Sequence, residues 1–114
     1  MEYLLLIYED EKRFTGLNPS DFTIELGQYQ AFGKEFAGAI KGGNALQPTA
    51  TAATVRVRDG KPLVTDGPFA ETKEQLGGYY LVEAASPEEA KTMAAKIPGA
   101  RFGCVEVRPI QKFS

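Results

Sequence analysis

The residues best suited to chemistry are concentrated in one stretch, "TDGPFAETKEQLGGYY", residues 65–80. It combines an Asp-Gly-Pro turn, four charged side chains and a pair of tyrosines. Carboxylates, an ammonium group and phenolic hydroxyls at this density are typical of a polar ligand site. The candidate ligand-binding residues in it are Asp66, Glu71, Thr72, Lys73, Tyr79 and Tyr80.

Two interpretations of this stretch stay open. In the first, the polar residues from Asp66 to Lys73 line the mouth of a pocket, and Tyr79 or Tyr80 forms a wall with a polar tip. In the second, Asp66 accepts hydrogen bonds from its own turn, Gly67 is extended before Pro68, Phe69 fills the core, and the charges are solvated.

Arg56 and Glu106 are two further candidate site residues. Each alternates with valines in a predicted strand, and Val55 and Val57 are expected to face the helices, so that Arg56 and Glu106 project to the opposite side. They would form either an ion pair that fixes the register of a dimer or the charged floor of a ligand site. An arginine with spare donors would favour an anionic ligand such as a carboxylate.

Composition excludes several classes of mechanism. The chain has no histidine, which removes imidazole bases, histidine-ligated metals and Ser-His-Asp triads. We expect no cofactor and no metal site. The single cysteine, Cys104, predicts a small buried residue in a chain without a disulfide, which favours the cytoplasm.

Charge and hydropathy argue against two kinds of partner. Thirteen basic against fifteen acidic side chains give a net charge of -2, so no nucleic-acid partner is expected. The apolar run at the N-terminus, residues 3–8, is too short to cross a membrane. An RNA-binding module of similar topology is disfavoured, because "LGGYYLVEA" lacks the basic residue and aromatic spacing of its signature strand.

Periodicity and turn signals predict a single domain over residues 1–114. Ser20 is the expected N-cap of the first helix, and "KGGN" its stop. Asp59-Gly60 predicts a tight hairpin turn, and Ser86 with Glu89 a capping box. The predicted elements are a strand at 2–8, a helix from 20 to about 41, a short strand at 45–47, a hairpin of 54–58 with 61–65, a strand at 78–84, a helix at 87–97 and a strand at 103–108.

This order, β-α-β(hairpin)-β-α-β, predicts an α+β fold of ferredoxin-like type, with an antiparallel sheet and both helices on one face. The strand at 2–8 is nevertheless apolar on both faces. Something must cover the second face, and a second copy packed with twofold symmetry is the simplest cover. The sequence therefore predicts a homodimer.

The chain also resembles a known family. "DGPFAETKEQLGGYYLVEA", preceded by "TVRVRDGKPLVT" and by "YLLLIYED", is similar to the DGPF branch of the YCII-related proteins. The resemblance implies a dimeric α+β barrel built from ferredoxin-like protomers. Some relatives use a His-Asp pair at a pocket between protomers, and this chain has no histidine to carry that pair.

The resemblance leads to two functional expectations. Members of this branch are often encoded beside extracytoplasmic-function sigma factors, which implies a dimer that binds a small molecule and acts with such a regulatory partner. The alternative is a cofactor-free isomerase, lyase or hydrolase of a small molecule. Its general base would be Asp66 or Glu71, with a pKa raised by burial.

Overall fold

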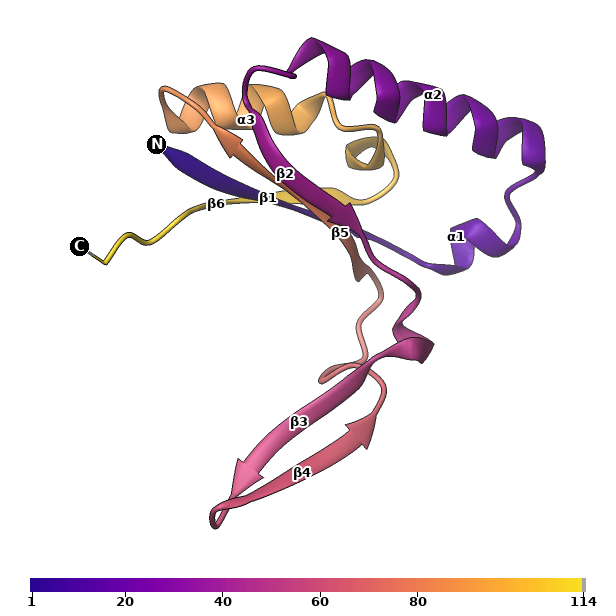
Figure 1. Ribbon diagram of the computed structural model, residues 1–114. Helices are drawn as coiled ribbons and strands as arrows, with labels where there is room; N and C mark the ends of the chain where they lie inside the picture. The colour runs from indigo at the N-terminus through magenta and orange to yellow at the C-terminus, as the bar shows by residue number, and fades with distance from the viewer. Residues whose placement is uncertain (114) are drawn as a thin grey trace.

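The computed structural model describes residues 1–113 and shows a four-stranded antiparallel sheet beside a separate two-stranded hairpin (Figure 1). The sheet order β2-β5-β1-β6 is that of the predicted ferredoxin-like fold. Both long helices lie on the same side of the sheet. The elements are β1 (Glu2–Glu9), α1 (Lys12–Thr15), α2 (Pro19–Glu35), β2 (Ile40–Ala45), η1 (Thr49–Thr51), β3 (Ala53–Arg58), β4 (Lys61–Asp66), β5 (Gln75–Glu83), α3 (Pro87–Ala95), η2 (Pro98–Arg101) and β6 (Cys104–Pro109).

The core lies between the sheet and the helices. On the central strand β1, every second side chain is buried against the helices, and the intervening ones are half-buried on the other face. The helices contribute Phe32 from α2 and Met93 from α3. The core residues are Tyr3, Leu5, Ile7, Phe32, Val82, Ala84, Ala90, Met93, Ala94 and Ile97.

Helix α2 differs from the predicted helix at its start. Asn18, not Ser20, is the N-cap: its side chain accepts a hydrogen bond from the backbone N–H of Asp21 at 2.8 Å, and Pro19 takes the first helical position. Asn is as good an N-cap as Ser, and Pro at the next position is already set for the helix.

The helix also ends earlier than predicted, at Glu35. The "KGGN" segment is not its stop but the middle of strand β2, which runs along the edge of β5. Ile40 fits helical spacing, but its backbone pairs with Val82 of β5. Pairing with β5 therefore prevails over the helical spacing of Ile40, because the glycines of this segment lower its helix propensity.

Helix α3 follows the prediction closely. Ser86 Oγ accepts the backbone N–H of Glu89 at 3.2 Å, and the Glu89 carboxylate accepts the N–H of Ala85 at 3.3 Å. The predicted capping box is thus present, with Glu89 reaching one residue further back than the usual partner. Met93 and Ile97 are buried on the sheet, as the spacing indicated.

The hairpin β3–β4 forms as predicted, with Asp59 and Gly60 at φ values of 51° and 74° in its turn. It does not, however, join the main sheet, and it projects away on the side opposite the helices (Figure 1). The prediction that Val55 and Val57 face the helices is therefore wrong: they are 62% and 60% exposed. The alternation of apolar and polar residues along the strand identified which side chains share a face, but not which part of the molecule that face contacts.

Candidate functional sites

The Asp-Gly-Pro turn is held by two hydrogen bonds to the backbone of Gly67. The N–H of Gly67 donates to the carbonyl of Ala52 at 2.7 Å, and Thr54 Oγ1 donates to the carbonyl of Gly67 at 2.8 Å. Gly67 has φ of +95°, so the prediction of an extended residue was wrong. Only glycine adopts this conformation cheaply, so the turn depends on Gly67 itself.

The segment that follows, residues 67–74, crosses from the hairpin back to the sheet with its side chains mostly outward. Glu71, Thr72 and Lys73 are exposed, and Phe69 is 81% exposed rather than buried in the core as the second interpretation held. Thr72 Oγ1 donates to the carbonyl of Glu74 at 2.5 Å, which is a local contact. In the single chain these side chains rim the base of the hairpin.

A small polar network fixes that base. The Glu11 carboxylate accepts the N–H of Thr49 at 2.6 Å and its hydroxyl at 2.8 Å, and Gln75 accepts the N–H of Glu11 at 2.9 Å. The Gln75 amide in turn donates to the carbonyl of Thr72. The segments that lead into and out of the hairpin, at Thr49 in η1 and Gln75 in β5, are therefore both tied to Glu11, two residues after β1.

The sheet face opposite the helices has an apolar centre and polar edges. The register places Leu4 and Leu6 of β1 beside Leu81 of β5 on this face, all half-buried. Among residues 1–113, no helix or strand packs over this face of the sheet, which lies away from α2 and α3 (Figure 1). We call this surface the open face; it consists of Leu4, Leu6, Tyr8, Asn44, Tyr79, Leu81, Cys104, Glu106 and Arg108.

The two candidate tyrosines lie on opposite faces. Tyr79 is on the open face, where its hydroxyl accepts a hydrogen bond from Asn44 Nδ2 at 2.9 Å. Tyr80 is on the helix side, with its ring centroid 5.0 Å from that of Phe32, and burial raises its pKa. Only Tyr79 is placed to meet a ligand on the open face.

Glu106 lies at the other edge of the open face. Its carboxylate accepts a hydrogen bond from the Tyr8 hydroxyl at 3.2 Å and lies 3.6 Å from Arg108 Nε. Burial, followed by this contact with Glu106, raises the pKa of Tyr8. Arg56 is exposed on the hairpin, and the partner of Glu106 within the chain is Arg108.

Cys104 completes that edge and corrects a further expectation. It is exposed on the open face rather than buried, with Sγ 3.8 Å from a carboxylate oxygen of Glu74. Partial desolvation and the charge of Glu74 raise the pKa of the thiol. A raised pKa keeps the sulfur protonated and weakly nucleophilic.

The structure therefore divides the sequence-predicted residues into three groups. Tyr79 and Glu106 share the open face, on either side of Leu6. Tyr80 belongs to the core side of the sheet. The hairpin and its base carry the remaining five, which are Arg56, Asp66, Glu71, Thr72 and Lys73.

A second polar cluster, on the helix side, was not predicted from the sequence. Arg13 Nη2 donates to Glu9 Oε1 and to Glu25 Oε1, each at 2.8 Å. Both glutamates are only 8% exposed. The guanidinium lies over the Phe102 ring, 3.9 Å from its centroid, and its buried Nε has no hydrogen-bond partner among residues 1–113.

Burial governs the protonation of this cluster. Desolvation raises the pKa of Glu9 even though Arg13 pulls it down. Desolvation, reinforced by the charges of Glu9 and Glu25, raises the pKa of Tyr29 to about 12. A Cβ on Gly99 would come within 2.9 Å of the Tyr29 hydroxyl. The absence of a side chain at residue 99 therefore lets η2 pack closely against Tyr29.

One sequence signal could have suggested the cluster. Glu25 occupies the buried face of α2, whereas the apolar side chains of Phe22 and Leu26 are each 47% exposed. A helical phase set by Phe32, Tyr29 and Glu25 would have placed the carboxylate inward. The strongly apolar neighbours obscured that phase.

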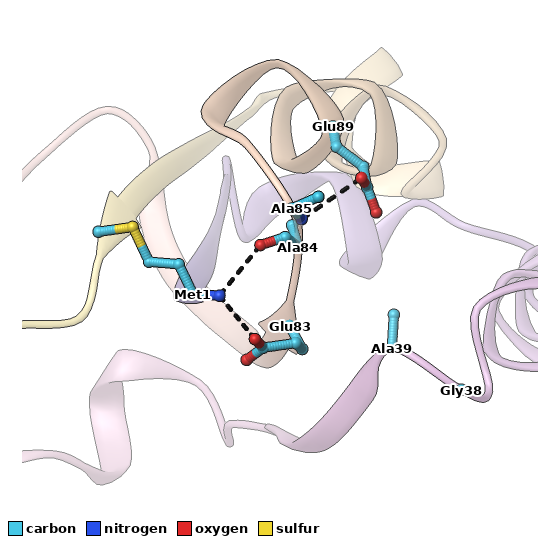
Figure 2. A pocket seen from close by; sticks show the side chains of 7 residues that line it. All are labelled: Met1, Gly38, Ala39, Glu83, Ala84, Ala85 and Glu89. Carbon is cyan, nitrogen blue, oxygen red and sulfur yellow. Dashed lines mark hydrogen bonds and ion pairs between the residues drawn. The ribbon is translucent and has the colours of Figure 1, made fainter.

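The chain also has a shallow hollow of about 400 Å³ beside its first residue, shown in Figure 2. The Met1 ammonium donates to Glu83 Oε1 at 2.6 Å and to the carbonyl of Ala84 at 3.2 Å. The ammonium lowers the pKa of Glu83. These contacts join the residue before β1 to the end of β5, the two central strands, and the hollow contains none of the predicted site residues.

Two features are absent from residues 1–113. No helix there is both long and apolar enough to span a bilayer. In the same residues no three Cys, Asp or Glu side chains converge as metal ligands would.

The architecture and the open face define a protein of the α+β, ferredoxin-like class. Residues 1–114 match the YCII-related domain, so the chain belongs to the YCII-related family. An uncharacterised protein of Rhizobium meliloti (strain 1021) is 39% identical over 114 residues, which is 96% of this chain and 92% of that protein.

A solved structure of similar fold is 5-chloro-2-hydroxyhydroquinone dehydrochlorinase from Burkholderia phenoliruptrix AC1100, in complex with 2,5-dihydroxybenzoquinone. It aligns with a TM-score of 0.50 over 97% of this chain and 94% of its own, at 15% sequence identity. At that identity the likeness concerns the fold.

Proposed function

We propose that the protein is a homodimer that binds a small molecule between its two copies, at the open face. The observation that carries this is the open face itself. Three leucines lie uncovered between a Tyr79–Asn44 pair at one edge and a Tyr8–Glu106–Arg108 group at the other. An apolar centre with a few convergent polar groups is typical of a small-molecule site once a second copy closes it.

The polar edges favour a ligand with an apolar body and an anionic group. Arg108 contacts Glu106 through Nε at 3.6 Å, which leaves the terminal guanidinium nitrogens available. Guanidinium groups bind carboxylates through paired hydrogen bonds. The hydroxyls of Tyr8 and Tyr79 can orient the rest of the molecule.

Native mass spectrometry of the protein, purified gently from its own host, tests both parts of the proposal. We expect a dimer with a reproducible additional mass of metabolite size. Arg108→Ala should lose that mass, whereas Lys91→Ala, a matched removal of an exposed cation on α3, should keep it. A dimer that is empty in the wild type would refute the ligand, and a monomer would refute the homodimer.

A second candidate function is a cofactor-free enzyme, favoured by the buried carboxyl of Glu9. General bases in enzymes are commonly carboxylates with a pKa raised by burial, and Glu9 has one. The structure of similar fold is named as a dehydrochlorinase of a hydroxyhydroquinone, which suggests a substituted hydroquinone as a first substrate to test. Asp66 and Glu71 are exposed, so they lack the burial that a base was expected to have.

Turnover of a chlorinated hydroxyhydroquinone, followed by chloride release, separates these candidate bases. If Glu9 is the base, Glu9→Gln should abolish release and Asp66→Asn should retain it, with the fold of both variants checked by circular dichroism. Release that survives in Glu9→Gln would contradict the enzymatic role of Glu9. Association with a sigma factor stays a prediction, and co-purification with an affinity-tagged chain from host lysate would test it.

A further inference from the structure

The hairpin β3–β4, which we call the arm (residues 53–66), is incomplete in a single chain. The register places Val55 opposite Val64 and Val57 opposite Pro62, so one face of the arm is apolar. The three valines are at least 60% exposed. An isolated two-stranded hairpin is marginally stable in water, and needs a further packing surface.

The dimensions of the chain lead to the same conclusion. Its radius of gyration is 16.2 Å, whereas a compact domain of this length has about 13 Å. The arm accounts for much of this excess, because it projects away from the sheet and helices (Figure 1). If the chain folded alone, we would expect the exposed valines of the arm to pack against the rest of the same chain.

The open face alone is small for a stable interface. Its strands β2, β5, β1 and β6 have 6, 9, 8 and 6 residues, and spacings of about 3.3 Å along a strand and about 4.8 Å between strands give a flat footprint of about 460 Å². Stable dimers bury about 800 Å² on each partner. The apolar face of the arm, with the same spacings, adds about 200 Å², and the exposed Phe69 at its base adds an aromatic anchor.

We propose that two copies exchange arms: the valine face of each arm packs on the partner copy, beside the twofold contact between the open faces. This inference rests on the proposed homodimer and specifies how it is built. A twofold axis lets each copy give one arm and receive one, so the assembly closes at two chains.

Arm exchange also gives residues 66–74 a place in the assembly. This segment leaves the arm at Asp66 and returns to the sheet at Gln75, so it lies where the two copies meet. Glu71 and Lys73, which rim the base of the arm in one chain, would then stand at the edge of the closed space. The ligand site would be completed by groups from both copies.

Light scattering of two matched variants over a range of concentrations tests the exchange. Val57→Lys adds a charge to the apolar face of the arm, and Thr65→Lys adds the same charge to its opposite, polar face. We expect Val57→Lys to raise the dimer dissociation constant at least tenfold, because the change occurs twice in each dimer. Thr65→Lys should change it by about twofold or less.

A cross-linking measurement covers the case in which Val57→Lys misfolds. Lys61→Cys at the tip of the arm, in a Cys104→Ser background, is labelled with benzophenone maleimide and mixed with unlabelled subunits enriched in ¹⁵N. Photocross-links from a light arm to a heavy chain support exchange. Cross-links confined to one chain contradict it.

The outcomes distinguish the two proposals. A wild-type protein that is monomeric at tens of micromolar refutes the homodimer, and the exchange with it. A stable wild-type dimer in which Val57→Lys and Thr65→Lys behave alike, with cross-links confined to one chain, refutes arm exchange and leaves the homodimer intact.

Discussion

Replacing Arg13 with methionine would test whether the buried Glu9–Arg13–Glu25 cluster stabilises the fold through charge. Both carboxylates bond the same nitrogen of Arg13, so they lie about 5–6 Å apart without a cation between them in the variant. At an effective dielectric constant of about 20, two unit charges at that distance repel by about 3 kcal/mol. Breaking a buried ion pair by removing one partner costs about 3–5 kcal/mol.

We therefore expect Arg13→Met to lose about 3–4 kcal/mol of unfolding free energy at pH 7, out of about 5–15 kcal/mol for a domain of this size. The loss should shrink near pH 4, because burial raises the pKa of Glu9, and the repulsion disappears once Glu9 takes up a proton. Urea unfolding at fixed protein concentration, at both pH values, measures it. Lys96→Met is the matched control, because Lys96 pairs with Glu35 at the surface and should lose less than about 1 kcal/mol.

Two results would refute this reasoning. A loss below about 1 kcal/mol at pH 7 would mean that water screens the two carboxylates. An equal loss at both pH values would mean that the variant removes the packing of the Arg13 guanidinium on the Phe102 ring, and not the repulsion between the carboxylates. The triple variant Glu9→Gln, Glu25→Gln, Arg13→Met should recover most of the stability, since no buried charge remains.

Three further predictions follow from single residues. Because burial raises the pKa of Glu9, the folded protein holds this proton more tightly than the unfolded chain; stability should therefore fall as pH rises from about 4.5 through the raised pKa, and Glu9→Gln should flatten that slope in urea titrations. Tyr29 should ionise near pH 12 in an absorbance titration, with stability lost between pH 10 and pH 12 by up to about 1.4 kcal/mol per pH unit, and Tyr29→Phe should remove this loss. Gly67→Ala should weaken the base of the arm by about 1–2 kcal/mol, seen as faster hydrogen exchange of the residue 67 amide, whereas Gly16→Ala at φ of -99° should not change it.

Local signals in the sequence were sufficient where the structure they specify is local. The capping box at Ser86 and the Asp59-Gly60 turn depend on residues close in the chain, and both are present. The end of α2 was predicted wrongly because Ile40 continues a helical spacing while its backbone pairs with Val82, far away in the sequence. The helical periodicity of a segment contains no information about whether its backbone pairs with a strand that is distant in the sequence.

The candidate site shows the same limit more sharply. Alternation correctly separated Glu106 and Arg108 from the valines beside them, because their strand is part of the sheet. The same rule failed for Val55 and Val57, since no pattern within the arm reveals that it leaves the sheet. Placing Arg56 near Glu106 required a fact about tertiary structure that the two strands do not encode.

The buried cluster and the segment 66–74 lie on different sides of the sheet, and this separates the two functional hypotheses. Glu9 and Glu25 are enclosed by elements of their own chain, including Gly99 and the Phe102 ring over Arg13. The arm and the open face, in contrast, are the surfaces that our proposal places in contact with a second copy. If ligand binding depends on the dimer, Val57→Lys should abolish it and leave the pKa of Tyr29 near 12, whereas a reaction at Glu9 should survive in the monomeric variant. The single substitution Val57→Lys in the arm therefore distinguishes a site at the open face from a reaction at Glu9 on the helix side of the sheet.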